Sequence, residues 1–317
     1  MLTYSLKRLL ALIPVLAVVS IVIFAIIHLT PGNPARAILG PEASAQDVDA
    51  LSERLGLNRP LVVQYLEWLA HAFTGDLGDS LFLRKPVTQA IVDNAVPTVQ
   101  LAVVALLVAV LIAVPLGTLA ARWRGSALDA AAMGVSLIGM AVPSFVLGLV
   151  LILVFAVWLR VLPVAGYESL FDDPAAAVRY LVLPATSLGA VLAAFLLRTT
   201  RASVLDVMSS DYIEAARSRG VGESRLLFRH TLRNAGLPIV TAVGLTFGAL
   251  ITGAVVTETI FTIPGIGSLL VNAIKRRDYP VIQGVVMFAT LAYLTVNLVV
   301  DLLYGLVDPR IRLSGKS

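Results

Sequence analysis

Apolar residues along this chain are gathered into six long runs separated by polar stretches. The runs cover about residues 9–29, 97–121, 131–159, 180–197, 237–258 and 281–306. Roughly 20 apolar residues in a helix cross the ~30 Å hydrocarbon core of a bilayer, and a helix satisfies its backbone hydrogen bonds internally, as lipid requires. The pattern lacks the alternation typical of strands, so it predicts an all-α integral membrane protein with about six transmembrane helices.

The first polar stretch, residues 31–96, predicts a small helical cap. It opens with the turn cluster Pro31-Gly32-Asn33-Pro34, and its later helical pattern is interrupted at Gly56 and Pro60. The apolar residues at helical spacing are Leu51, Leu55, Tyr65, Leu66 and Leu69. Such a cap either covers the helical bundle or contacts an external partner that presents substrate.

The second polar stretch, residues 198–237, contains a short predicted helix. Asp211 is a suitable N-cap with Glu214 three residues later, and Gly220 supplies a left-handed C-terminal stop. An isolated helix of about two turns is marginal in water, so we expect it to pack on something. Either the polar residues only cap and solvate this helix, or they form a docking site.

A second helix is predicted in the same stretch, over about residues 223–235. Arg225, Arg229 and Arg233 follow one another at intervals of four residues and so share one face. That face is either a solvated surface that sets membrane orientation or part of the docking site, and Pro238 is expected where the next span begins.

Composition supports the membrane assignment. Hydrophobic residues make up 58% of the 317 residues and charged residues 14%, and the mean hydropathy is +0.90. The net charge of +4 comes from basic residues that flank the apolar runs and are not interleaved with aromatics. We therefore expect membrane lipid as a partner and no nucleic acid.

The basic residues also predict the orientation. With a cytoplasmic N-terminus, the inner segments carry Lys7, Arg8, Arg122, Arg124, seven arginines between Arg198 and Arg233, Arg310, Arg312 and Lys316. The short outer loops are poorer in lysine and arginine, as the positive-inside rule requires. Both termini are expected in the cytoplasm and the cap outside.

The first apolar run is expected to remain as an anchor. It is longer than the roughly 7–15 apolar residues of a signal peptide. Ala35-Arg36-Ala37 resembles a cleavage site, but Pro31 and Pro34 separate it from the run.

No chemistry of catalysis or metal binding is indicated. The chain has no cysteine, its three histidines lie far apart, and neither a G-x-S-x-G nor an H-E-x-x-H motif is present. The fragment Gly315-Lys316-Ser317 has Arg310 where a phosphate-binding loop needs its first glycine. We expect a non-catalytic chain without a cofactor or a metal, and an intramembrane enzyme is disfavoured.

Small and hydroxylated residues mark one face of the fifth run. Thr241, Gly244, Gly248 and Thr252 lie roughly along this face, and Glu258 lies near the end of the run. They either pack against a neighbouring helix or line a translocation path for polar solutes. A secondary transporter or channel would favour ionisable residues near the midplane or broken helices in corresponding halves, and neither is clear in the sequence.

Short strings in a fixed order carry a resemblance. Glu214-Ala215-Ala216 followed by Gly220, in a cytoplasmic loop before the penultimate span, resembles the EAA loop of ABC importer permeases. Further strings are Leu12-Ile13-Pro14-Val15-Leu16, Pro31-Gly32-Asn33-Pro34, Leu55-Gly56-Leu57, Gln64-Tyr65-Leu66, Gly75-Asp76-Leu77-Gly78, Arg229-His230-x-Leu232-Arg233-Asn234, Pro264-Gly265-Ile266-Gly267, Arg277-Asp278-Tyr279-Pro280 and Asp308-Pro309-Arg310-Ile311-Arg312. Over nearly the full length the chain resembles the dipeptide/oligopeptide/nickel permease family. It departs from the broader permease pattern after Gly220, where only Leu237-Pro238 appears and comes several residues late.

The resemblance implies a permease of the type I ABC importer kind in the inner (plasma) membrane. Its expected partners are a second homologous permease subunit, two cytoplasmic ATPase subunits that bind ATP and Mg, and an extracytoplasmic substrate-binding protein. The coupling residues toward the ATPases would be Asp211, Tyr212, Glu214, Ala215, Ala216, Arg219 and Gly220. Di- and oligopeptides are the leading substrates, and nickel complexes, glutathione and opine-like solutes stay open.

The predicted organisation has four parts. They are an N-terminal tail and first span at 1–30, the cap at 31–96, a permease core at 97–306 with its coupling loop at 198–237, and a cytoplasmic tail at 307–317.

Overall fold

The structure is a computed structural model that describes residues 2–29, 34–40, 42–54 and 56–307. The regular elements in this part of the chain are helices, and one isolated antiparallel bridge joins Asp79 and Pro86. The predicted all-α fold class is therefore confirmed. The turn cluster predicted at 31–34 and the tail predicted at 307–317 lie outside the described residues, except for Pro34 and Val307.

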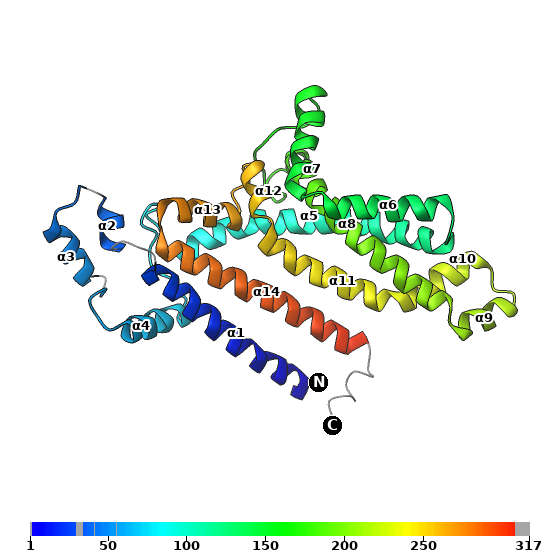
Figure 1. Ribbon diagram of the computed structural model, residues 1–317, viewed down its shortest axis with the longest axis horizontal. Helices are drawn as coiled ribbons and strands as arrows, with labels where there is room; N and C mark the ends of the chain where they lie inside the picture. The colour runs from blue at the N-terminus through cyan, green and yellow to red at the C-terminus, as the bar shows by residue number, and fades with distance from the viewer. Residues whose placement is uncertain (1, 30–33, 41, 55, 308–317) are drawn as a thin grey trace. The chain divides into compact units, whose positions relative to one another are not determined.

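Long helices alternate with short ones along the chain (Figure 1). In order they are α1 (Leu2–Leu29), α2 (Pro34–Leu39), α3 (Ala45–Arg54), α4 (Leu61–Phe73), α5 (Val87–Arg122), α6 (Ala127–Ala141), α7 (Ser144–Leu151), the π-helical η1 (Ile152–Trp158), α8 (Pro174–Met208), α9 (Asp211–Ser218), α10 (Glu223–Arg225), the π-helical η2 (Leu226–Thr231), α11 (Leu232–Gly253), α12 (Val255–Ile260), α13 (Ile266–Arg276) and α14 (Tyr279–Val307). The helices predicted on the two sides of Gly56 and Pro60 are α3 and α4.

Three of the described helices are long and apolar enough to cross a membrane, namely α5, α8 and the Tyr279–Val300 part of α14. The count rises to four if α6 and the helix that follows it form one broken span. The described apolar part of α1, Leu10–Ala25, is shorter. A multi-pass membrane fold is thus supported, while the number of six spans stays a prediction.

The third apolar run is not one helix, as the sequence predicted, but two. Helix α6 and the helix that continues from α7 through η1 are bent by 100° at Val142 and Pro143. Pro143 is the N-cap of α7 and Val142 is extended, with φ −85° and ψ 121°. A residue before proline avoids the helical region because the pyrrolidine ring crowds its backbone, so the chain breaks here and not merely kinks.

Contacts divide the chain into two compact units. The larger unit comprises Pro97–Pro264 and the chain from Thr295 onward, and the smaller unit comprises Leu2–Val96 and Gly265–Leu294. Each unit has a buried apolar cluster of its own. The predicted division at 1–30, 31–96, 97–306 and 307–317 stays a prediction.

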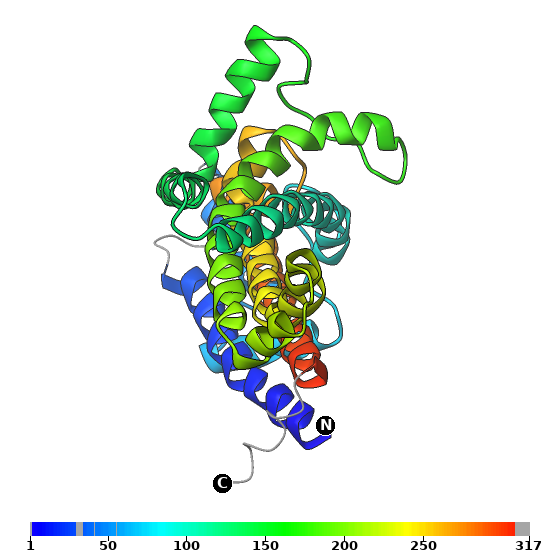
Figure 2. The ribbon, with the colours of Figure 1, turned by 90° about the vertical axis from the view of Figure 1, so that its right-hand side faces the viewer.

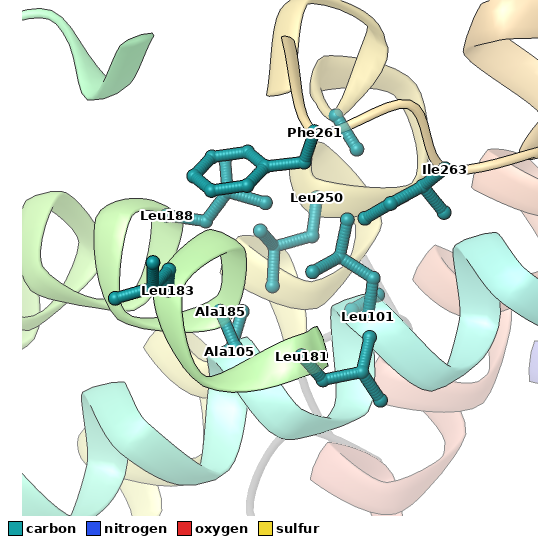
Figure 3. Close-up of a cluster of buried hydrophobic side chains, with 11 residues drawn as sticks. Leu101, Ala105, Leu181, Leu183, Ala185, Leu188, Leu250, Phe261 and Ile263 are labelled. Atoms are coloured by element: carbon teal, nitrogen blue, oxygen red, sulfur yellow. The ribbon is translucent and has the colours of Figure 1, made fainter. Parts of the chain in front are cut away.

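Helix α8 is the centre of the larger unit. It packs against α11, α6 and α7, and its buried side chains face a cluster that also receives Leu101 of α5 and Leu250 of α11 (Figure 3). Phe261 and Ile263, which follow α12, complete this cluster. Because close van der Waals packing is a main source of helix association in lipid, this cluster holds α5, α8 and α11 to one another.

Two glycines let α5 and α8 approach closely. A Cβ atom added to Gly189 of α8 would lie 2.6 Å from the carbonyl oxygen of Ala105. One added to Gly117 of α5 would lie 2.7 Å from the carbonyl oxygen of Leu197. Small residues of this kind are typical of helix contacts inside membranes.

In the smaller unit, α1 packs against α4. The rings of Phe24 and Tyr65 meet edge to face with centroids 5.4 Å apart, and the hydroxyls of Ser20 and Tyr65 are 2.8 Å apart. A second contact joins segments far apart in sequence, because the Ser80 hydroxyl donates to the Asp278 carboxylate at 2.6 Å.

Candidate functional site

The short polar helix predicted in the arginine-rich loop is α9, and it joins two long helices of the larger unit. Two residues separate the end of α8 at Met208 from the start of α9 at Asp211, and the chain from Glu223 continues through α10 and η2 into α11. Figure 1 shows α9 and α10 together at the end of α8 and α11 that lies away from α12. A displacement of α9 would therefore act on both long helices.

The start of α9 differs from the prediction by one position. Ser210, with φ −80° and ψ 144°, precedes the helix, and Asp211 is its first residue. The Ser210 hydroxyl donates back to the Val207 carbonyl of α8 and makes no cap bond in α9, so the prediction of Asp211 as the N-cap, with Glu214 three residues later, is wrong. Both carboxylates lie in the first turn, where the helix dipole favours negative charge.

The end of α9 is as predicted. Gly220 has φ +78°, and its N–H donates to the Arg217 carbonyl at 3.0 Å. A Cβ atom added to Gly220 would meet nothing within 4 Å. Glycine is therefore favoured here for its left-handed backbone and not for lack of space.

One buried side chain anchors α9. Ile213 is 1% exposed, and α9 contacts η2, where Leu226 and Leu227 are also buried. Ala216 is half-buried, whereas the other six predicted coupling residues, Asp211, Tyr212, Glu214, Ala215, Arg219 and Gly220, are exposed. The helix thus holds to its own chain by one apolar contact and presents a mostly polar surface outward.

Polar contacts brace α9 from the side. The Tyr212 hydroxyl donates to the His230 carbonyl at 3.2 Å and accepts from the Asn234 side chain. Arg217 Nε donates to Glu223 Oε1 at 2.7 Å, and this hydrogen bond lowers the pKa of Glu223. The Arg217 pKa is raised by the same bond. These contacts tie the beginning and the end of α9 to the segment that becomes α11.

The second predicted helix is not separate. Residues Glu223 to Gly253 continue through α10, η2 and α11, so the predicted end near residue 235 is wrong and Pro238 lies inside α11. The π-helical turns of η2 connect the loop to the span without a break in the helix. Arg225, Arg229 and Arg233 are exposed.

An ion pair that sequence reasoning missed lies at the same end of α8. Arg201 Nε and its terminal nitrogen donate to the two carboxylate oxygens of Asp129 at 2.6 and 2.8 Å, and the Gly125 N–H donates to the same carboxylate at 2.9 Å. This two-pronged contact fixes the turn between α5 and α6 on α8. The only local signal was Ser126, which caps α6 by accepting from the Asp129 N–H.

The residues predicted to line a path have mixed surroundings. A Cβ atom added to Gly244 would collide with Val300 of α14, so Gly244 lies at a helix contact. Gly248 is buried, and the Thr241 hydroxyl donates to the Leu237 carbonyl of its own helix at 3.0 Å. The side chain of Thr252 lies outside the described residues.

Glu258 is fully buried, and its Oε1 accepts from the Thr98 hydroxyl at 2.6 Å. This contact joins α12 to α5. A role of these five residues in a path stays a prediction. Among the described residues, no group of three or more histidine, aspartate or glutamate side chains could hold a metal ion.

Comparison with known proteins adds a family to this geometry. Residues 113–313 match the family described as binding-protein-dependent transport system inner membrane component, and residues 1–102 match the N-terminal family of such membrane components. Together the two matches leave few residues of the chain uncovered.

Named relatives align over nearly the whole chain. The probable peptide ABC transporter permease protein y4tP of Sinorhizobium fredii (strain NBRC 101917 / NGR234) is 44% identical over 309 residues, with 98% of this chain and 99% of that protein covered. The glutathione transport system permease protein GsiC of Escherichia coli O6:H1 is 43% identical over 312 residues, with the same coverage. A solved amino acid ABC transporter with histidines aligns at a TM-score of 0.48 and 17% identity, over 70% of this chain and 94% of that chain.

Proposed function

Because the chain belongs to the family of binding-protein-dependent transport system inner membrane components, it is a membrane permease subunit, and we propose that it carries peptides or similar small solutes into the cell. In this proposal separate ATPase subunits dock on α9 and drive the rearrangement of the helices. The observation that carries it is the exposure of α9 at the junction of α8 and α11, with Ile213 as its buried anchor.

The contacts around α9 support a mechanical role. Ile213 packs into the segment that leads to α11, while the chain enters α9 directly from α8. The Arg217 to Glu223 hydrogen bond closes the turn at Gly220. A displacement of α9 would therefore move both α8 and α11, because the segments that join α9 to them are held by these contacts.

The Asp129 to Arg201 pair extends this connection to α6. Asp129 is 5% exposed, and the planar guanidinium of Arg201 meets both of its carboxylate oxygens. Breaking a buried charge pair of this kind leaves an uncompensated charge. We infer that α6 follows α8 when α9 is displaced.

The proposed cycle uses two conformations. Closure of the ATPases on ATP would push α9 and open the bundle toward the binding protein, and hydrolysis would return it to an inward-open state. A partner can shift such an equilibrium only by binding one state better than the other. In this scheme the chain supplies the translocation path and the helix α9 that receives the movement of the ATPases. ATP and Mg bind to the partner subunits.

Substrate and partners are proposed from the relatives. One of them is named as a peptide permease and another as a glutathione permease, and glutathione is itself a tripeptide. A second, homologous permease subunit would complete the path. The substrate-binding protein would deliver the solute on the side away from α9, with both termini of this chain in the cytoplasm.

Glu214→Lys tests the docking role of α9. Glu214 is exposed, so charge reversal leaves the core of the larger unit intact. We expect the amount of ATPase that co-purifies with the tagged chain to fall about tenfold, equivalent to about 1.4 kcal/mol. The matched control is Asp206→Lys, because Asp206 is an exposed acidic residue near the end of α8 and is not among the predicted coupling residues.

Full co-purification of ATPase with the Glu214→Lys chain would remove Glu214 from the docking site. An equal loss with Asp206→Lys would mean that charge alone, and not contact with α9, governs the association.

A further inference from the structure

A cavity of about 530 Å³ lies in the larger unit, between the segment that follows η1 and the first two turns of α8. Arg160, Leu162 and Pro163 line it from one side, and Arg179 and Tyr180 line it from the other. Figure 2 shows η1 and the start of α8 diverging, with a loop between them. The cavity is at the N-terminal end of α8, whereas α9 follows its C-terminal end.

The charge in this cavity is positive. Neither Arg160 nor Arg179 forms an ion pair with a carboxylate in the described part of the chain. The one acidic side chain in the lining, Asp173, accepts from the N–H groups of Ala175 and Ala176 at 3.0 and 3.1 Å and so caps α8. Its carboxylate is held at the start of α8, and the two guanidinium groups outnumber it, so the cavity keeps a net positive charge that suits an anion.

The surroundings of the cavity are apolar and exposed. Trp158, at the end of η1, is 69% exposed, and Phe171 is 83% exposed. Val161, in the cavity lining, is 54% exposed. Aromatic side chains beside arginines at the end of an apolar helix are typical of the boundary between hydrocarbon and headgroups.

The loop that connects the two sides of the cavity, residues 164–172, is held in place. The Gly166 N–H donates to the Phe261 carbonyl at 2.9 Å, and the Tyr167 hydroxyl donates to Gln100 Oε1 at 2.8 Å. Burial raises the pKa of Tyr167. A Cβ atom added to Gly166 would lie 2.9 Å from the ring of Tyr180, which shows how closely the loop approaches α8.

We propose that this cavity binds the phosphate of an anionic phospholipid headgroup, such as phosphatidylglycerol. Arg160 and Arg179 would pair with the phosphate oxygens, and the acyl chains would lie along the exposed apolar side chains of η1. A cavity of this size is large enough for a glycerophosphate group. An acidic protein partner would match the charge but would leave Trp158 and Phe171 in water, so lipid is the occupant that fits both features.

The test uses the full chain reconstituted in vesicles without ATPase subunits, so it does not depend on the proposed transport function. Trp68→Phe and Trp123→Phe leave Trp158 as the sole tryptophan. Quenching of Trp158 by brominated phosphatidylglycerol is compared with quenching by brominated phosphatidylcholine. Each basic residue near an anionic surface contributes about fivefold in affinity, so we expect at least fivefold selectivity for phosphatidylglycerol.

Variants locate the selectivity. The double variant Arg160→Gln with Arg179→Gln is expected to lower the selectivity for phosphatidylglycerol over phosphatidylcholine to about onefold. The double variant Arg160→Lys with Arg179→Lys is expected to retain most of this selectivity. The matched control, Arg225→Gln with Arg229→Gln, changes two exposed arginines near α9 and should leave it unchanged. Native mass spectrometry of the purified chain, in which phosphatidylglycerol should remain bound only when both arginines are present, gives a second measurement for a variant of reduced stability.

Equal quenching by the two lipids in the chain that retains Arg160 and Arg179 would overturn the proposal. So would a selectivity for phosphatidylglycerol that persists when both arginines are replaced by glutamine. Loss of selectivity in millimolar glycerol phosphate would show a free phosphate site in place of a lipid site. If the Gln pair keeps its lipid selectivity but loses stimulation by the binding protein, the cavity is a protein-docking site and the lipid proposal is wrong.

Discussion

Gly220 and Gly222 are two positions apart in the predicted coupling loop, but their backbones differ. Gly220 has φ +78° and Gly222 has φ −62°, and a Cβ atom added to either would meet nothing within 4 Å. The two sites are thus equal in space and unequal in conformation. Only Gly220 needs the left-handed region that L side chains avoid.

Gly220→Val should therefore uncouple the permease, whereas Gly222→Val should not. A side chain in the left-handed region costs about 1–2 kcal/mol, and a β-branched one costs most. We expect ATP-dependent uptake by the reconstituted complex to fall several-fold for Gly220→Val and to stay near normal for Gly222→Val. Normal uptake with both variants would show that the turn after α9 has no part in coupling.

Among the elements, α8 connects the two candidate sites of the larger unit. Its N-terminal turns line the basic cavity, its middle packs on α5 and α11, and its last turns lead into α9. Its contact with α5 depends on Gly189, beside the Ala105 carbonyl. A helix of this length passes a displacement to its neighbours only if it packs closely against them. Loose packing would leave voids, and the atoms that line a void lose van der Waals contacts.

Gly189→Ala tests this contact. The added methyl would lie 2.6 Å from a backbone oxygen, so α5 and α8 would have to separate. Overpacking of this kind costs about 1–3 kcal/mol, and we expect a lower melting temperature in detergent. In Gly134→Ala of α6 the methyl meets nothing within 4 Å, so the change should be neutral or stabilising by up to about 1 kcal/mol. An unchanged melting temperature for Gly189→Ala would mean that the two helices are loosely packed.

At the scale of the molecule, the chain has two units with separate cores, and α5 and α14 contribute residues to both. The surface that our proposal assigns to the ATPases belongs to the larger unit, as does the basic cavity. In our proposal the energy for directed transport comes from separate ATPase subunits.

Transport should accordingly require the whole complex. In vesicles that contain all subunits, we expect solute uptake to need both ATP and the binding protein and to be unaffected by a proton ionophore. The chain alone should give no flux above that of empty vesicles. Flux by the isolated chain, or uptake driven by an ion gradient, would favour the alternative of a secondary transporter or channel.

Features set by neighbouring residues could be predicted from the sequence. The long apolar runs predicted helices because lipid offers no hydrogen-bond partner to backbone polar groups. Gly220 predicted a left-handed helix end because few other residues adopt that backbone conformation. The helices on either side of Gly56 and Pro60 were predicted from apolar residues at helical spacing, which is also a local pattern. The coupling loop was predicted from the strings Glu214-Ala215-Ala216 and Gly220, which lie within one short stretch, and its role in coupling stays a prediction.

Other features depend on contacts between residues far apart in the chain, and the sequence did not reveal them. Asp129 meets Arg201 across 72 positions and Glu258 meets Thr98 across 160. The burial of Ile213 also depends on the segment that packs beside it. Hydrophobic length and backbone preference act locally and are visible in a string of residues, whereas side-chain pairing and close packing exist only once the helices have been brought together.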